Sequence, residues 1–364
     1  MTHSPTPCTT LEAVYDEVVG LDPGRSVLFL GGTDTGKSTA VRNIANRILE
    51  SGRSVVVIDL DVGQGELGPP GTISAALGQA NTSIRSVREL PVISTRFVGA
   101  VTPVRHLLEI CLGAVKLVED ARAHDPGIVL IDTCGLISGS SGRVLKRRLI
   151  EALVPDIVVA IDSQGELDAI LSTQDGLKRP RILRASPAAE TGRKTPAVRG
   201  TRRAARFLAA FDEAKSVALS FDDVAIVGAT FSGGQPMSLS VSNMTANTLR
   251  ADVMYAVDLP DGSSFVIMRQ TSWYTEALAE LGSTLRRRPI HVTSAVNYAH
   301  LLVGLVDRDG IYRGVGIIER IDFERRLLTV LTRCSQGLIA QVQLGYLRVR
   351  ADGREIAEVR PGDI

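Results

Sequence analysis

A short glycine-rich stretch has the residue types and spacing needed to hold phosphate. It matches the pattern G-x-x-x-x-G-K-[ST] and runs Gly31-Gly32-Thr33-Asp34-Thr35-Gly36-Lys37-Ser38-Thr39. Glycines let backbone N–H groups approach phosphate oxygens, and the N-terminus of a following helix favours negative charge there. Lys37 is expected to reach the β- and γ-phosphates, and Ser38 to join a Mg²⁺ shell. The stretch therefore predicts a P-loop, with the residues from Gly32 to Thr39 binding nucleotide.

Carboxylates follow two further apolar runs, which is where a P-loop enzyme needs them beside its metal ion. Asp59 and Asp61 lie two residues apart, so in a regular strand they share a face. Asp132 ends another apolar run in the form of a Walker B strand and could bind Mg²⁺ through water. Thr133 and Gly135 come next and could line a substrate channel. The alternative for each aspartate is a turn residue after a buried strand.

A basic stretch lies in the middle of the chain. Residues 178–206 hold ten lysines and arginines against one acidic residue, Glu190. Guanidinium groups from this stretch could close over a transferring phosphoryl group, where negative charge develops. We expect most of them to lie on a solvated helix and at least one to enter the site. Residues 185–192 are predicted to form a mobile loop before a helix that starts near Thr195 and Pro196.

The elements that must position these groups alternate along the first half of the chain. Apolar runs typical of buried strands occur at 26–30, 54–60, 91–98, 127–132 and 156–161. Helical spacing of apolar residues is found at 10–19, where Thr10 is a candidate N-cap, and at 37–50, 104–123 and 141–153. This alternation predicts the α/β class: a P-loop NTPase with a mainly parallel sheet flanked by helices on both faces.

The second half of the chain has a different character. Short β-like runs at 223–227, 264–268, 301–306, 314–318 and 327–331 are separated by Asp-Gly and Gly-Gly turns. Asp309-Gly310 lies between two of these runs, as in a hairpin. We therefore expect two domains: residues 1–217 as a P-loop domain and residues 218–364 as a smaller, mainly β domain.

Composition narrows the class of protein. The chain has 364 residues, 44% of them apolar, and a formal net charge of +1, so any affinity for polyanions must come from local patches. Its four cysteines show no metal-binding spacing, as expected for a cytoplasmic protein without structural zinc. No apolar run approaches the roughly 18 residues of a membrane span. The Asn-Lys-x-Asp element of GTPases is absent, which favours ATP.

At these residues the sequence resembles the Clp1/Grc3 family of polynucleotide 5′-hydroxyl kinases, over nearly all of its length. The P-loop matches, including Asp34, which is unusual in P-loops generally. Phe97-Val98-Gly99-Ala100-Val101-Thr102-Pro103 and Asp132-Thr133-Cys134-Gly135 resemble further family segments. The lid, at about 186–211, is matched by Lys194-Thr195-Pro196-Ala197-Val198-Arg199 with Arg203 and Arg206. The most specific match is Asp59-Leu60-Asp61-Val62-Gly63-Gln64-Gly65, followed by Pro69-Pro70-Gly71-Thr72.

The resemblance implies transfer of the ATP γ-phosphate to the 5′-hydroxyl of RNA, DNA or both, on single-stranded ends. It implies that Lys37 holds the β- and γ-phosphates, that Asp61 is the general base and that Arg199 binds the γ-phosphate. Gln64, Thr102, Thr133, Lys194 and Arg203 would contact the acceptor. Ser38, Asp59, Asp61 and Asp132 would form the Mg²⁺ site.

The sequence departs from the family pattern at three points, and the first two leave other interpretations open. The first lid position is Lys194 rather than arginine, so a bidentate fork is lost. Leu136 stands where an aromatic residue often follows T-C-G and could stack on a base. The first 22 residues leave no room for the N-terminal β domain of eukaryotic members, so we expect a prokaryotic-type member with unknown protein partners. The alternatives are an ATP-binding scaffold in RNA processing and an NTPase switch driven by hydrolysis.

Overall fold

The chain divides into two compact units, which are described separately. The computed structural model describes residues 10–187, 195–286 and 289–364. The N-terminal unit ends at Arg203, and the C-terminal unit runs Ala204–Ile364. This division falls earlier than the boundary expected at residues 217 and 218. The reason is that the end of helix α6 and all of β8 belong to the second unit.

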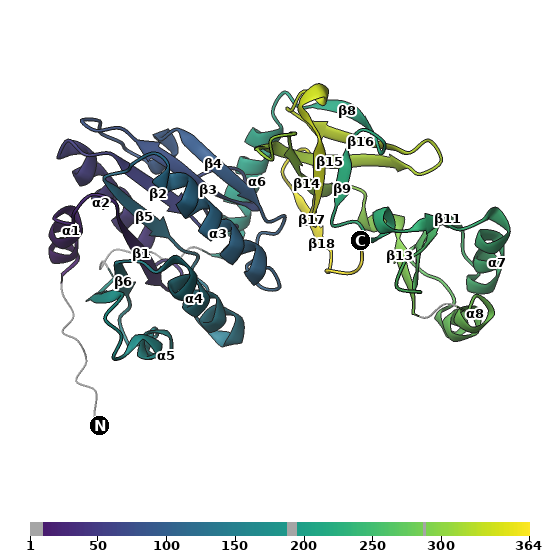
Figure 1. The fold of residues 1–364 in the computed structure, drawn as a ribbon, viewed down its shortest axis with the longest axis horizontal. Coiled ribbons are helices and arrows are strands. Elements are labelled where there is room, and N and C mark those ends of the chain that lie inside the picture. Colours follow the sequence, from purple (N-terminus) through teal and green to yellow (C-terminus); the bar gives the residue numbers. More distant parts are fainter. Residues whose placement is uncertain (1–9, 188–194, 287–288) are drawn as a thin grey trace. The chain divides into compact units, whose positions relative to one another are not determined.

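The N-terminal unit is built on a seven-stranded sheet with the order β4-β3-β2-β5-β1-β6-β7 (Figure 1). All neighbouring strands are parallel except β3, which is antiparallel to both β2 and β4. The predicted mainly parallel sheet is confirmed, and β3 and β7 are additions to the expected strands. The strands are β1 Arg25–Gly31, β2 Val55–Asp59, β3 Thr72–Gly78, β4 Val92–Phe97, β5 Ile128–Asp132, β6 Ile157–Ile161 and β7 Arg181–Ala185.

Helices cover both faces of this sheet, as the alternation of elements predicts. Neighbouring residues of each strand point to opposite faces, so Val27 and Phe29 pack with α1 and α2, whereas Leu28 and Leu30 pack with α3 and α4. Thr10 caps α1 by accepting the N–H of Ala13 at 3.3 Å. The helices are α1 Leu11–Val19, α2 Lys37–Glu50, α3 Leu107–Arg122, α4 Gly139–Leu153, α5 Asp168–Leu171 and α6 Pro196–Phe211, the last of which runs on into the second unit.

The C-terminal unit is mainly β, as predicted, and its larger sheet has the order β18-β17-β14-β15-β16-β8, with β9 paired to β17. The hairpin expected around Asp309-Gly310 joins β14 to β15, which pair antiparallel. The strands of this sheet are β8 Lys215–Ser220, β9 Ala225–Val227, β14 Leu301–Val306, β15 Tyr312–Asp322, β16 Leu327–Thr332, β17 Gln341–Val349 and β18 Glu355–Glu358.

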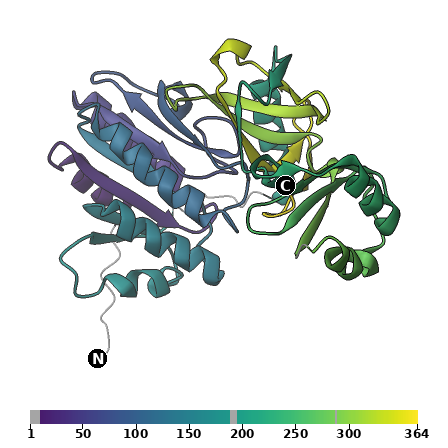
Figure 2. The same cartoon turned by 45° about the vertical axis from the view of Figure 1, so that its right-hand side comes forward.

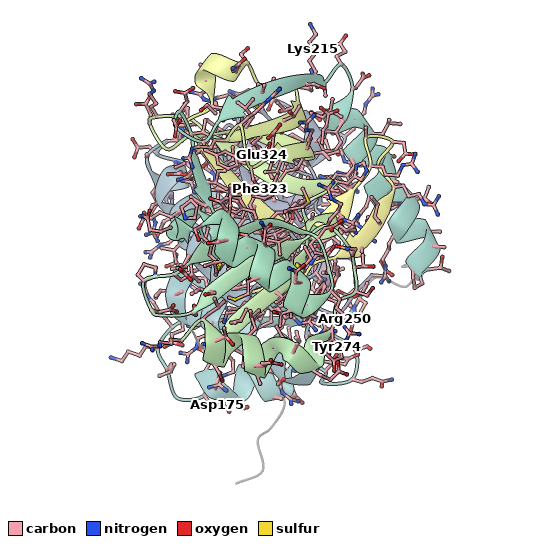
Figure 3. All side chains as sticks on the ribbon, turned by 90° about the vertical axis from the view of Figure 1, so that its right-hand side faces the viewer. Asp175, Lys215, Arg250, Tyr274, Phe323 and Glu324 are labelled. Atoms are coloured by element: carbon pink, nitrogen blue, oxygen red, sulfur yellow. The ribbon has the colours of Figure 1, made fainter. Side chains whose placement is uncertain are left out.

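The same unit also holds a smaller α/β layer, of which only the strand at 264–268 was expected from the sequence (Figure 2). Its sheet has the order β10-β11-β12-β13, with β10 Gln235–Pro236, β11 Val253–Asp258, β12 Ser264–Met268 and β13 Ile290–Ser294. One face packs against the larger sheet through Val257 and Phe265. The other is covered by α7 Leu239–Leu249 and α8 Leu278–Thr284. Near α7, the Arg250 guanidinium lies over the Tyr274 ring, 4.8 Å from its centroid (Figure 3).

No helix in the described part of the chain is both long and apolar enough to cross a membrane.

Candidate functional site

The predicted P-loop lies at the carboxyl edge of the parallel strands, between β1 and α2. Gly36 is the N-cap of α2 and has a φ of 91°, a left-handed conformation that glycine adopts without a steric cost. A side chain at Gly31 would lie 2.7 Å from the Ile161 carbonyl, so only glycine fits where the loop leaves the sheet. The loop therefore leads directly into the N-terminus of α2, where the backbone N–H groups of a helix favour an anion.

Three polar side chains meet at the start of α2 and the end of β5. The Ser38 hydroxyl donates to Asp132 Oδ2 at 2.5 Å, and Lys37 Nζ donates to the Gly32 carbonyl at 2.6 Å. Asp132 Oδ1 is buried and has no hydrogen-bond partner among the described residues. Burial lowers the pKa of Lys37 and raises that of Asp132 to about 6, while the charge of Lys37 opposes the shift of Asp132.

Asp59 is occupied by its own loop. It lies opposite Asp132 in the β2–β5 register, as the two strand ends predict. However, its Oδ1 accepts the N–H of Asp61 at 3.0 Å, and its Oδ2 accepts the N–H groups of Glu66 and Leu67. Burial raises the pKa of Asp59 to about 7, and the charges of Asp132 and Asp61 add to the shift. The structure thus gives Asp59 the turn-forming role that we had considered as the alternative to metal binding.

Asp61 lies in the same loop with one carboxylate oxygen engaged. Its Oδ1 accepts the N–H groups of Gly63 and Gln64 at 3.0 and 2.8 Å. No hydrogen bond to its Oδ2 comes from the residues that the structure describes. A side chain at Gly63 would lie 2.5 Å from the Val101 carbonyl, which explains the glycine at that point of the motif. The loop therefore holds Asp61 in one orientation with an oxygen available to a ligand.

Arg199 reaches the P-loop from α6. Its guanidinium donates to Asp34 Oδ2 at 3.0 Å, and the side chain is 29% exposed. Gln64 Nε2 donates to the Arg199 backbone carbonyl at 3.3 Å, so the Asp61 loop also contacts α6. Of the described basic residues of the stretch, Arg199 is thus the one that pairs with the P-loop.

The other predicted acceptor residues have mixed placements. Thr133 is 2% exposed and its hydroxyl donates to the Phe29 carbonyl at 2.7 Å, so it supports the sheet edge. Thr102 accepts the N–H of Val104 at 3.3 Å, next to the segment that contacts Gly63. Arg203 is half-buried on α6, four residues after Arg199 and on the same face. Lys194 and most of the predicted loop lie outside the described residues.

The donor set fits a magnesium ion that is shared with a nucleotide. No cluster of three or more His, Cys, Asp or Glu residues is arranged as a metal site in the part of the chain that the structure describes. Mg²⁺ is usually held by one or two protein oxygens together with phosphates and water. Ser38 and the unpartnered Oδ1 of Asp132 could supply such oxygens, with Asp61 near them, whereas both oxygens of Asp59 are already engaged.

Lys146 on α4 belongs to the site and was missed in the sequence. It is fully buried, and its Nζ donates to the Cys134 carbonyl at 2.6 Å and lies 3.3 Å from Cys134 Sγ. The next residue, Gly135, has no room for a side chain, because a Cβ there would lie 2.7 Å from Thr33 Cα in the P-loop. The ammonium group therefore holds in place the segment after β5, which packs against the P-loop.

We expect Lys146→Met to lower the free energy of unfolding by about 1–3 kcal/mol, because the Cys134 carbonyl loses a charged donor in a buried position. Urea unfolding measures this change. Lys116→Met is the matched control, since Lys116 is 61% exposed on α3 and pairs with Glu119. The control should change stability by less than about 0.5 kcal/mol. Equal changes in the free energy of unfolding in the two variants would contradict a structural role for Lys146.

The fold and the site define the class of protein. A glycine-rich loop lies between a parallel strand and a helix, its serine donates to the Walker B aspartate, and its lysine donates to a carbonyl of the loop. This is the arrangement of a P-loop nucleotide-binding protein.

Comparison with known proteins gives the family. The P-loop model of the mRNA cleavage and polyadenylation factor CLP1 matches residues 31–213. A polyribonucleotide 5′-hydroxyl-kinase of Pyrococcus horikoshii is 30% identical over 94% of this chain and 90% of its own length. The corresponding protein of Thermococcus kodakarensis is 31% identical over 93% and 92%. The chain therefore belongs to the CLP1 P-loop family, as its motifs predicted.

A solved structure supports the fold. The Clp1p chain of a complex with Pcf11p aligns with a TM-score of 0.56, covering 94% of this chain and 80% of that one at 15% identity.

Proposed function

We propose that the protein transfers the γ-phosphate of ATP to the 5′-hydroxyl end of a polynucleotide, RNA or DNA. The single observation that carries this proposal is the meeting of three groups at one sheet edge. These groups are the Ser38–Asp132 pair, the Asp61 carboxylate and the Arg199 guanidinium bound to Asp34. The archaeal relatives, which match over nearly the whole chain, are named as kinases of this type.

Each residue has a defined part in the transfer. The 5′-oxygen forms a bond to the γ-phosphorus, the bond from that phosphorus to the β–γ bridging oxygen breaks, and ADP leaves. The proton of the 5′-hydroxyl goes to Asp61, whose Oδ2 is the available oxygen of a carboxylate held by Gly63 and Gln64. Lys37 and Arg199 stabilise the negative charge that develops on the transferred phosphoryl oxygens.

Ser38 and Asp132 would hold Mg²⁺, which would neutralise part of the negative charge of the nucleotide phosphates. Gln64, which contacts both its own loop and the Arg199 carbonyl, keeps α6 next to the base. We place Thr102 and Arg203 beside the acceptor strand and Thr133 behind the site, as a support. The proposal includes a role in RNA processing. It places the protein in the cytoplasm, because the four cysteines are scattered along the sequence, as is common in a reducing compartment.

The test is transfer of labelled γ-phosphate from ATP to short single-stranded RNA and DNA oligomers. Each oligomer is offered with a 5′-hydroxyl or a 5′-phosphate, and Lys37→Ala is the control variant. We expect label on the 5′-hydroxyl oligomers alone and none with Lys37→Ala, because the phosphates lose their cation in the P-loop. ATP binding without transfer to any oligomer would favour the scaffold, and hydrolysis of ATP without an acceptor would favour the switch.

A further inference from the structure

A row of arginines follows the exposed face of α4 away from the catalytic edge. The helix begins soon after Asp132, so its first turn lies at that edge, and it runs Gly139–Leu153 to the opposite edge of the sheet. Arg143 and Arg147 are exposed and four residues apart, which places them on one face, one helical turn from each other. Neither has an ion-pair partner in the part of the chain that the structure describes.

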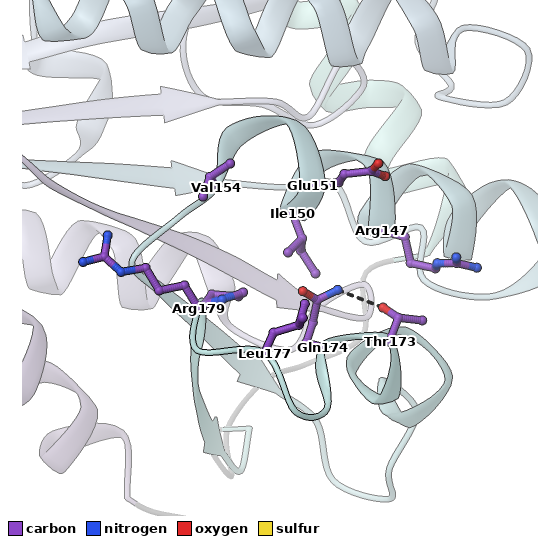
Figure 4. Close-up of a pocket in the computed structure, with 9 residues that line it drawn as sticks. Arg147, Ile150, Glu151, Val154, Thr173, Gln174, Leu177 and Arg179 are labelled. Atoms are coloured by element: carbon purple, nitrogen blue, oxygen red, sulfur yellow. Dashed lines mark hydrogen bonds between the residues drawn. The ribbon is translucent and has the colours of Figure 1, made fainter.

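This row ends at a pocket of about 340 Å³ at the far end of α4 (Figure 4). Its exposed aliphatic residues are Val154 at the end of α4 and Leu177 in the loop before β7, which are 61% and 59% exposed, and the Gln174 amide lies next to Leu177. Gln174 Nε2 donates to Thr173 Oγ1 at 2.9 Å, so the Gln174 side-chain carbonyl oxygen takes no part in that hydrogen bond. The pocket thus combines aliphatic surfaces, onto which a flat ring can pack, with amide and hydroxyl groups that can contact its edge.

Cations dominate the charge around the pocket. Arg147 and Arg179 lie at opposite ends of the lining residues, and the Arg179 side chain is 61% exposed although it contacts Asp156 at 3.3 Å. The acidic lining residue, Glu151, is already paired with Arg148 at 2.7 Å. Lys178 adds an exposed amine beside Arg179. A ligand that suits this surface carries repeated negative charges and at least one ring.

We propose that this face of α4 and the pocket at its end bind the acceptor strand downstream of its 5′ end. Arg143 and Arg147, about 6 Å apart along the helix at ~1.5 Å per residue, contact phosphates about two nucleotides apart, and one base packs against Leu177 in the pocket. The inference rests on the proposed function, because a polynucleotide is the occupant whose phosphates and bases match the charges and surfaces described above.

The length of α4 sets the expected length of the acceptor. Its 15 residues span about 22 Å at ~1.5 Å per residue. A stacked strand that advances about 3.4 Å per nucleotide covers this distance in roughly six nucleotides. A dinucleotide therefore covers only the catalytic edge, whereas a 12-nucleotide oligomer also covers the arginines and the pocket.

The experiment measures binding and transfer with 5′-hydroxyl oligoribonucleotides of 2 to 12 nucleotides. In fluorescence anisotropy, Arg143→Gln/Arg147→Gln should weaken binding of the 12-mer by about tenfold. The slope of log affinity against log salt should fall by about 0.7 for each arginine removed. In the transfer assay the same variant should raise KM for the 12-mer and leave its kcat unchanged. KM and kcat for the dinucleotide should also be unchanged. Arg122→Gln is the matched control, an exposed arginine in the last turn of α3.

A second variant tests the pocket. Leu177→Ser removes an apolar surface and no charge, so we expect affinity for the 12-mer to fall by about fivefold, the low end for loss of one base contact, with an unchanged salt slope. Equal losses for the dinucleotide and the 12-mer, or arginine variants that match Arg122→Gln, would overturn the proposal and assign the surface to another kind of partner. Because anisotropy reports binding without transfer, absence of kinase activity in the unmodified protein would leave this result readable.

Discussion

Asp61→Asn should reduce phosphoryl transfer to background while ATP binding stays within about threefold of the unmodified protein. The amide oxygen can still accept the N–H groups of Gly63 and Gln64, which hold the side chain at 3.0 and 2.8 Å. The loop therefore keeps its shape. The substituted group, however, cannot take a proton from the 5′-hydroxyl, and a proton-transfer residue typically contributes about 10²–10⁴-fold to the rate.

Transfer kinetics with a 5′-hydroxyl oligomer and an ATP-binding titration test this prediction together. Asp125→Asn is the matched control: the same change at an exposed aspartate whose positive φ of 45° asparagine also tolerates. We expect no change in either measurement for the control. Turnover of Asp61→Asn within tenfold of the unmodified protein would exclude Asp61 as the base.

Asp59→Asn should behave differently from Asp61→Asn, although the two residues belong to one motif. The Asp59 carboxylate accepts the N–H groups of Asp61, Glu66 and Leu67 through both oxygens. An amide offers a single acceptor oxygen, so some of these buried N–H groups would lose their partner. A sequence pattern cannot separate these two functions, because a strand-ending aspartate has the same neighbours in the sequence whether it binds metal or closes a loop.

The sequence predicts best where a local pattern determines the structure. The helix expected at 37–50 is α2, with the same bounds, because the P-loop fixes its start and Ser51-Gly52 fixes its end. In contrast, α7 was missed because its serines, threonines and asparagines are neither strong helix formers nor spaced as an apolar stripe. Its stability comes from contacts with β11 and β12, which a sequence pattern does not contain.

Lys146 shows a signal that was present but not used. Gly142, Lys146, Leu149 and Leu153 follow the spacing of the buried face of α4, so the lysine occupies an inward position. The helix was predicted at 141–153, but no residue on it was singled out from the sequence. The partner of its ammonium group, the Cys134 carbonyl, is a backbone atom and leaves no trace in the residue types.

Arg199→Ala should lower kcat for phosphoryl transfer by about 10³-fold or more, the scale of arginine contacts to a transferring phosphoryl group. Arg199 is the described basic residue of α6 that pairs with the P-loop, through Asp34 Oδ2 at 3.0 Å. Alanine removes both this ion pair and the guanidinium that would bind the γ-phosphate. Arg199→Lys keeps the charge without the planar fork and should recover only part of the rate.

Arg202→Ala is the matched control for this series, because Arg202 is an exposed arginine on the same helix. Asp34→Asn separates the two functions of Arg199. It weakens the contact with the P-loop but leaves the guanidinium able to bind phosphate, so its loss in kcat should be far smaller than that of Arg199→Ala. If kcat falls by the same factor in Arg199→Ala and in Asp34→Asn, the arginine acts by holding α6 to the P-loop. If Arg199→Ala loses less than tenfold, another group must stabilise the transferred phosphate.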